Sequence, residues 1–200
     1  MPKSFSPSCE RNKHPILEQL QVYFESSQSV LEIGSGTGQH AVFFAENLSQ
    51  LTWHTSDMPE NHDNINEWLS ETCLDNLNPP LALTIGQDPW PSVKIDSVFT
   101  ANTTHIMQPS EAEAMMKLIS IHLPGNGIFC QYGPMKISGD FTSDSNKEFN
   151  DSLKQRGFGG IRDVEQLVNW AENLQLIEMI PMPANNFLLV WKKSETSAIR

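Results

Sequence analysis

The stretch "SVLEIGSGTGQHAVFFAENL", residues 29–48, decides the fold of this chain. Its short β-branched run, 30–33, is typical of a buried strand, and the apolar residues of 41–48 recur at helical spacing. Between them lie three glycines at alternate positions, Gly34, Gly36 and Gly38. Glycine reaches positive φ at little cost and lets a ligand approach the backbone, so this spacing predicts a tight turn with something lying against it.

The composition predicts one soluble domain spanning residues 1–200. The hydrophobic fraction is 38%, and no apolar run approaches the roughly 18 residues that a membrane helix needs. Residues 1–15 lack the apolar core of a signal peptide, so we expect a cytoplasmic protein with no membrane partner. The three cysteines are far apart and lack a paired metal spacing, which predicts reduced thiols and no metal site.

The charge balance argues against a nucleic-acid partner. Lys and Arg total 13 against 24 Asp and Glu, a formal net charge of -11. Such a chain repels a phosphate backbone unless its cations gather in one patch, and the longest basic grouping is Lys192-Lys193. The sequence does not indicate an oligomeric state.

Strand and helix patterns alternate along the chain, which predicts a parallel sheet with right-handed crossovers. The predicted helices are 15–25, 38–48, 61–74, 110–123, 146–156 and 164–173. The predicted strands are 30–33, 51–55, 81–85, 97–101, 127–132, 177–181 and 187–191. Only "MPANN" separates the last two strands, so they should form an antiparallel hairpin.

This α/β pattern, a seven-stranded mostly parallel sheet with a C-terminal antiparallel hairpin and helices on both faces, resembles the Rossmann-like class I methyltransferase fold, which binds S-adenosylmethionine. A dinucleotide fingerprint starting at Gly34 would need a third glycine where this chain has Gln39. The E-x-G-x-G-x-G pattern is instead the usual first motif of those methyltransferases. We therefore expect S-adenosylmethionine as cofactor, S-adenosylhomocysteine as product, and cofactor contacts from Glu32, Gly34, Ser35, Gly36 and Gly38.

Two acids follow predicted strands. Asp57 stands where an acid accepts hydrogen bonds from vicinal ribose hydroxyls, although Ser56 or Asp57 can instead cap the following helix. Asp88, in "TIGQDPWPS", either accepts from an adenine amino group or closes an Asp-Pro turn.

Several segments together resemble the methyltransferase-like protein 26 family, the bacterial domain of unknown function 938 group, over nearly the whole chain. They are "ERNKHPIL" (10–17), "VLEIGSGTGQHAVFFA" (30–45), "SD" (56–57), "NTTHIM" (102–107), "YGP" (132–134), "FTSDSN" (141–146), "GIRD" (160–163) and "MPANN" (182–186). The resemblance implies a class I methyltransferase fold that binds S-adenosylmethionine, without a known substrate. It also implies that Arg11 and Asn12, in an N-terminal segment 1–28, fold over the cofactor as a lid. The family commonly has an acid where this chain has Thr84, which leaves the adenine contact open.

Polar residues after the fourth and fifth predicted strands are candidates for chemistry. Methyl transfer mainly needs an aligned nucleophile and sometimes the removal of a proton. His105 suits a general base, Asn102 can position a hydroxyl or amine and also contact the cofactor, and Tyr132 is a further candidate. The alternative is that His105 bonds to loop backbone and Asn102 makes a turn.

Four more residues are candidates for binding the substrate or the cofactor. Arg162 either receives a substrate carboxylate or forms an ion pair with Asp163. Asn185 and Asn186 are further candidates for substrate binding, and His40 either contacts the cofactor's carboxylate or is a packed or capping residue.

The sequence thus predicts a methyltransferase that acts on a small molecule. Its first alternative is a protein that binds the cofactor without catalysis, as a sensor or partner. A second alternative, an NAD-dependent oxidoreductase, is weakened by Gln39. Nucleic-acid methylation is disfavoured because "NTTH" lacks an aromatic residue that could stack on a flipped base.

Overall fold

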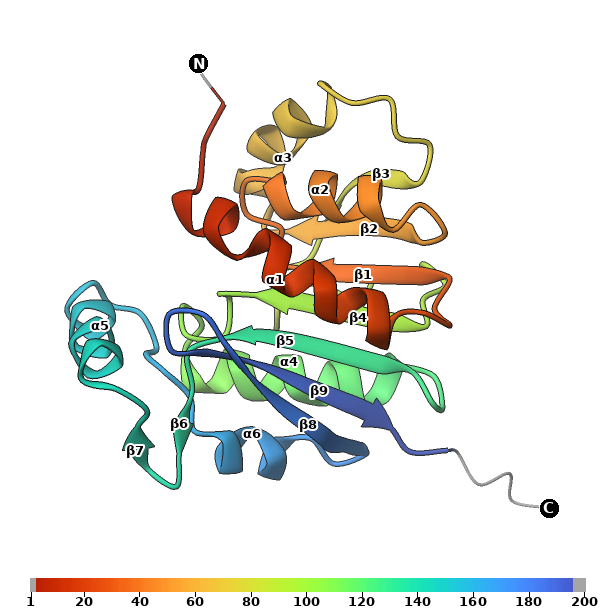
Figure 1. The fold of residues 1–200 in the computed structure, drawn as a ribbon. Coiled ribbons are helices and arrows are strands. Elements are labelled where there is room, and N and C mark those ends of the chain that lie inside the picture. The colour runs from red at the N-terminus through yellow and green to blue at the C-terminus, as the bar shows by residue number, and fades with distance from the viewer. Residues whose placement is uncertain (1–2, 196–200) are drawn as a thin grey trace. The chain divides into compact units, whose positions relative to one another are not determined.

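The computed structural model describes residues 3–195 and divides into two compact units, one ending at Ala101 and the other beginning at Asn102 (Figure 1). Within the described residues the main sheet has seven strands in the order β3-β2-β1-β4-β5-β9-β8, four from the N-terminal unit and three from the C-terminal unit. The predicted fold class is therefore confirmed. The prediction of a single domain stays a prediction.

The N-terminal unit is built around β1, which pairs in parallel with β2 on one side and β4 on the other. Its elements are α1 (Pro7–Tyr23), β1 (Ser29–Ile33), α2 (Gln39–Asn47), β2 (Thr52–Asp57), the 3-10 turn η1 (Pro59–Asn61), α3 (His62–Leu69), β3 (Leu77–Ala82) and β4 (Ser97–Ala101). Helix α2 contacts both α1 and α3. Beneath α2 the fully buried rings of Phe44, Trp53 and Phe99 lie 5.4 to 5.9 Å apart between centroids, so this unit has an aromatic core.

The C-terminal unit contains the predicted hairpin. Its elements are α4 (Pro109–His122), β5 (Ile128–Gly133), β6 (Lys136–Ile137), β7 (Asp140–Phe141), α5 (Asp144–Gln155), α6 (Val164–Trp170), β8 (Leu174–Met182) and β9 (Asn186–Lys193). Strand β9 runs antiparallel to both β5 and β8, which confirms the antiparallel C-terminal pair. In its core the buried Trp191 Nε1 donates to Gln131 Oε1 at 3.1 Å, and Gln131 Nε2 donates to Thr104 Oγ1 at 2.8 Å.

Helix α1 begins eight residues before the predicted start at Pro15. Ser6 is the N-cap, its hydroxyl accepts from the Cys9 amide, and Pro7 occupies the first turn, where a missing N–H costs nothing. Pro15 lies inside this helix. The prediction was wrong because Pro15 was taken as the start of the helix when the capping signal lies upstream.

Strand β3 begins four residues before its predicted start at 81. Two prolines such as those of "LNPPLA" would interrupt a central strand. Strand β3, however, pairs only with β2 and lies at the edge of the sheet. An edge strand tolerates residues that cannot donate to a ladder, and proline there also blocks pairing with another chain.

The end of α3 and the β6–β7 hairpin also differ from the prediction. Helix α3 ends at Leu69, five residues earlier than predicted, because the Ser70 and Thr72 hydroxyls donate to the carbonyls of Glu67 and Leu69 near its end. The short β6–β7 hairpin was not predicted; its strands are two residues each, too short to give a periodic signal. Within residues 3–195, no helix is long and apolar enough to cross a membrane.

Candidate functional site

The loop between β1 and α2 alternates left-handed glycines with ordinary residues. Gly34, Gly36 and Gly38 have φ values of 74°, 59° and 88°. The amides of Gly34 and Ser35 both donate to the Ser56 carbonyl at 3.0 Å, which fixes the loop to β2. The positive φ at each glycine agrees with the tight turn that the sequence predicts.

The glycines differ in what surrounds them. A Cβ added to Gly38 would lie 3.2 Å from both Cα and O of Ile65 and 3.3 Å from Trp68 Cβ, so Gly38 lets α3 pack closely on the start of α2. A Cβ added to Gly36 would meet nothing within 4 Å. Close packing against α3 therefore explains why position 38 is a glycine, whereas the space beside Gly36 is open.

The Asp57 carboxylate ties this loop to the end of β2. Its Oδ2 accepts from the Gly36 amide at 2.7 Å, and its Oδ1 accepts from the Met58 amide and from Asn61 Nδ2, both at 2.8 Å. The carboxylate does not cap α3, whose N-cap is Asn61. A carboxylate has about four acceptor sites, so Asp57 keeps about one for a ligand beside Gly36.

Glu32 lies beneath the loop and is only 2% exposed. Its Oε2 accepts from Ser35 Oγ at 2.9 Å and from Trp53 Nε1 at 3.1 Å. Burial raises the pKa of Glu32 to about 7, because these hydrogen bonds only partly offset the loss of water around a charge. Ser35 in turn accepts from the Ser56 amide at 3.2 Å, so both side chains support the loop from below.

Asp88 lies after β3 in the turn that the sequence offered as one of two alternatives. Its Oδ2 accepts from the Thr84 amide at 2.7 Å, and this bond lowers the pKa of Asp88. A contact of Asp88 with adenine stays a prediction.

The N-terminal helix is attached to the start of α2 through a buried polar pair. His40 Nε2 and Asn12 Oδ1 are 2.7 Å apart, and the His40 ring stacks on Phe44 at 5.2 Å. Burial lowers the pKa of His40 to about 4, so the ring is neutral near pH 7. Arg11 is exposed on the same helix. Asn12 and His40 thus have partners within the protein, and their contact with a cofactor stays a prediction, as does the lid.

The candidates for chemistry lie in the C-terminal unit, where Asn102 and His105 face one position. A Cβ added to Gly133 would lie 3.8 Å from His105 Nδ1 and 3.9 Å from Asn102 Oδ1. Asn102 has a φ of 58° and its amide donates to the Tyr132 carbonyl at 2.9 Å. A non-glycine residue in this conformation is uncommon and is often found at functional sites.

His105 is 6% exposed, and its ring packs edge-on against Phe149 at 5.3 Å between centroids. Burial, followed by the Arg162 charge, lowers the pKa of His105 to about 4. The neutral ring can therefore accept a proton, and the roles of Asn102, His105 and Tyr132 stay predictions.

The predicted substrate residues have different environments. The Arg162–Asp163 ion pair does not form; Asp163 caps α6 through the Glu165 amide and accepts from the Gly139 amide. Asn186 closes the β8–β9 turn, since its Nδ2 donates to the Pro183 carbonyl, whereas Asn185 Nδ2 donates to Ser145 Oγ and joins the turn to α5. Substrate contacts of these residues remain predictions.

Three residues that lie beside the predicted site residues were given no role from the sequence: Asn61, Gly133 and Phe149. Asn61 supports Asp57, and its position four residues after the acid in "DMPEN" was a usable signal. Gly133 and Phe149 lie beside His105 through tertiary contacts that no local pattern indicates.

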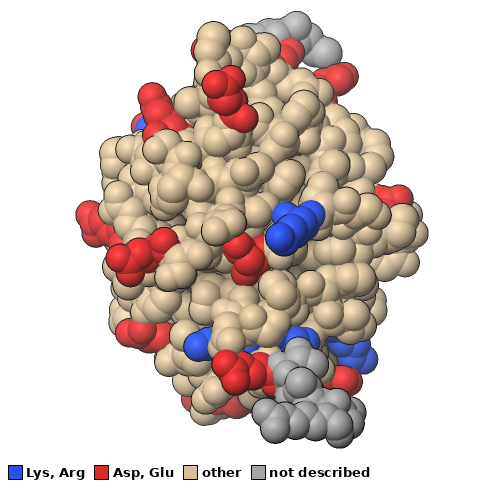
Figure 2. All heavy atoms as spheres, turned by 90° about the vertical axis from the view of Figure 1, so that its right-hand side faces the viewer, with Lys and Arg blue, Asp and Glu red and all other residues tan. Residues whose placement is uncertain are grey.

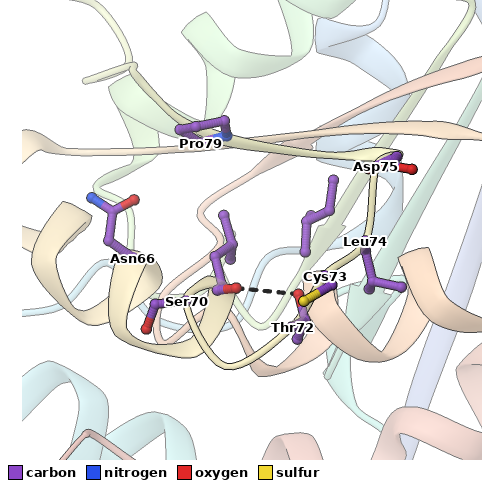
Figure 3. Close-up of a pocket in the computed structure, with 9 residues that line it drawn as sticks. Asn66, Ser70, Thr72, Cys73, Leu74, Asp75 and Pro79 are labelled. Carbon is purple, nitrogen blue, oxygen red and sulfur yellow. Dashed lines mark hydrogen bonds between the residues drawn. The ribbon is translucent and has the colours of Figure 1, made fainter.

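A pocket of about 500 Å³ lies between the end of α3 and the start of β3 (Figure 3). Asn66 lines it from α3, Ser70 lines it just after the end of that helix, and Pro79 lies across from them. The Thr72 hydroxyl donates to the Leu69 carbonyl at 3.1 Å. None of the predicted cofactor or substrate residues lines this pocket.

Figure 2 shows acidic side chains spread over one face of the molecule, with basic side chains in small separate groups. With a net charge of -11, this face offers no continuous basic path for a phosphate backbone.

Three solved structures with a similar fold are methyltransferases. An O-methyltransferase family protein from Burkholderia thailandensis matches with a TM-score of 0.79 and 13% identity, over 92% of this chain and 56% of that chain. An O-methyltransferase family 2 protein from Planctomyces limnophilus, solved with apigenin, matches with a TM-score of 0.77 and 17% identity, over 91% of this chain and 56% of that chain. Human N-acetylserotonin methyltransferase, solved with SAM, matches with a TM-score of 0.73 and 11% identity, over 92% of this chain and 55% of that chain.

These likenesses show that the chain has the class I methyltransferase fold, and the chain spans little more than half the length of these proteins. Residues 3–193 match the family described as "Protein of unknown function (DUF938)". The chain belongs to this family.

The two environments of the loop glycines lead to a prediction about stability. Gly38→Ala should lower the free energy of unfolding by about 1–3 kcal/mol more than Gly36→Ala, because only the first variant forces a Cβ against α3. Both variants share the cost of a left-handed residue with a side chain, roughly 1–2 kcal/mol. Urea unfolding of the two variants measures the difference, and equal losses would contradict the packing role of Gly38.

The buried Glu32 leads to a prediction about pH. Between its ordinary pKa of 4.5 and about 7, the folded protein holds a proton that the unfolded chain releases, so stability falls as pH rises across this window. Glu32→Gln stays neutral and avoids this loss. In urea unfolding, the free energy of unfolding of Glu32→Gln relative to that of the wild type should rise by roughly 3 kcal/mol between about pH 4 and pH 8.

The exposed Glu25 at the end of α1 provides the control, since Glu25→Gln should leave the pH profile unchanged. A Glu32→Gln profile parallel to that of the wild type would show that Glu32 is charged at no cost in the folded protein.

Proposed function

We propose that this protein is a methyltransferase that uses S-adenosylmethionine to methylate a small molecule in the cytoplasm. The observation that carries the proposal is the left-handed Gly36, with open space where a Cβ would lie, hydrogen-bonded to a carboxylate that keeps an acceptor site. The fold supports the same conclusion, since the three solved structures described above are methyltransferases. We also propose, from the sequence motifs, kinship to the methyltransferase-like protein 26 family.

The residues of the N-terminal unit fit a nucleoside cofactor. Asp57 can accept a hydrogen bond from a ribose hydroxyl at its remaining acceptor site, and a second such bond would replace one from Asn61 or Met58. Gly36 lets the ligand approach the backbone, while Glu32 and Ser35 hold the loop from beneath. S-adenosylmethionine supplies a methyl group on a sulfonium when bound.

The C-terminal unit supplies groups for the acceptor in this proposal. The Asn102 amide can orient a hydroxyl or amine, and the neutral His105 ring can take its proton. A ring whose pKa is near 4 is a weak base, so His105 is most useful for an acceptor whose proton is already acidic or becomes so as the bond forms.

S-adenosylmethionine and S-adenosylhomocysteine should each raise the melting temperature of the full chain, and NAD should not. At about 100 times the dissociation constant, a ligand specific to the folded state adds about 2.7 kcal/mol. Calorimetric titration with S-adenosylhomocysteine should show binding that Gly36→Ala removes, because the added methyl group occupies the space beside the loop.

Gly157→Ala is a matched control, since Gly157 has a φ of 83° and an added Cβ there also meets nothing within 4 Å. Normal binding of S-adenosylhomocysteine by Gly36→Ala, or stabilisation by NAD alone, would contradict the proposal. Binding without S-adenosylhomocysteine formation across a broad metabolite panel would favour a non-catalytic sensor.

A further inference from the structure

The C-terminal unit buries a cation that has no carboxylate partner. Arg162 is 5% exposed, and none of the ion pairs among the described residues involves it. Its Nε and Nη2 donate to the Gly160 carbonyl at 3.1 and 2.9 Å, and Nη2 also donates to the Gly159 carbonyl. Buried charges in proteins are usually paired, so a guanidinium held only by carbonyl groups is incompletely balanced.

One end of this guanidinium remains available. Within the described residues Nη1 has no hydrogen-bond partner, whereas every fully buried side-chain nitrogen or oxygen has one. Nη1 is therefore reached by solvent, with two N–H groups to offer. Lys154 Nζ also donates to the Gly159 carbonyl, so two cations meet at one oxygen.

The surroundings favour a carboxylate over a phosphate. The amides of Gly159, Gly160 and Ile161 already donate to Ile106 O, His105 O and Asn150 Oδ1. A phosphate, with more oxygens and usually two charges, typically gathers such backbone amides, and here all three are used. Nη1 can still donate a charge-assisted hydrogen bond to a carboxylate oxygen, and that contact does not need the three backbone amides.

The neighbouring rings suit a ligand with an apolar body. The bond from Gly160 to the His105 carbonyl joins the Arg162 segment to the His105 loop. The His105 ring is neutral near pH 7, and Phe149, packed against it, is 39% exposed.

We propose that Arg162 binds the carboxylate of a small organic acid with an apolar body, beside His105. The proposal deepens the proposed function, because it makes an organic acid the class of methyl acceptor, and in that respect it rests on it. Carboxylate binding itself does not require the cofactor.

NMR titration of the full chain without any cofactor tests the proposal, with sodium benzoate as the probe and benzamide as its neutral counterpart. The Arg162 Nε–H signal and the His105 ring signals should shift with benzoate and saturate with a dissociation constant in about the millimolar range. Benzamide should shift neither. Arg162→Gln should weaken benzoate binding at least about tenfold, the value of one charged hydrogen bond.

Arg156→Gln is the control, since Arg156 is exposed in the same unit and lies over the Phe158 ring. Arg162→Lys serves if the glutamine variant does not fold. It keeps the charge but lacks the planar guanidinium that presents Nη1 to the ligand, and it should bind benzoate more weakly.

Equal binding of benzamide, tighter binding of inorganic phosphate, undiminished benzoate binding by both Arg162 variants, or no saturation would each overturn the proposal. A separate titration with S-adenosylhomocysteine distinguishes this failure from failure of the proposed function, because the two ligands bind different residues.

Discussion

The hydrogen bond from the Gly36 amide to the Asp57 carboxylate is the interaction on which the candidate cofactor site depends. It joins the loop after β1 to the end of β2, and the Ser56 carbonyl secures the same loop through two more amides. The left-handed glycines make this path possible, because each bend occurs where a side chain would be strained. The result is exposed backbone beside a carboxylate, which is the chemistry that a nucleoside requires.

Glu32 in the N-terminal unit and Arg162 in the C-terminal unit are both buried without a counter-ion among the described residues, and the two side chains respond differently. Glu32 can take up a proton, and its pKa near 7 shows how burial favours that solution. Arg162 cannot lose its proton near neutral pH, even though burial lowers its pKa. The unbalanced charge of Arg162 therefore indicates an anionic ligand more strongly than the charge of Glu32 indicates a cationic one.

The sequence predicts the framework well because local patterns determine it. Each of the seven strands has its counterpart, and the glycine spacing predicts the left-handed loop. The start of β3 was missed because its edge position, which tolerates Pro79 and Pro80, is a property of the sheet. The convergence of His105 with Gly133 and Phe149 was invisible for the same reason, since it arises from tertiary packing. The ribose contact of Asp57 stays a prediction, and its hydrogen bond to the glycine loop became visible only in the structure.

A crystal structure of the full chain with S-adenosylhomocysteine tests the central claim most directly. The account predicts a ribose hydroxyl within hydrogen-bond distance of the Asp57 carboxylate and the ligand in van der Waals contact with Gly36. Ligand bound elsewhere, for example in the pocket between α3 and β3, with Asp57 still bonded only to Gly36, Met58 and Asn61, would contradict it.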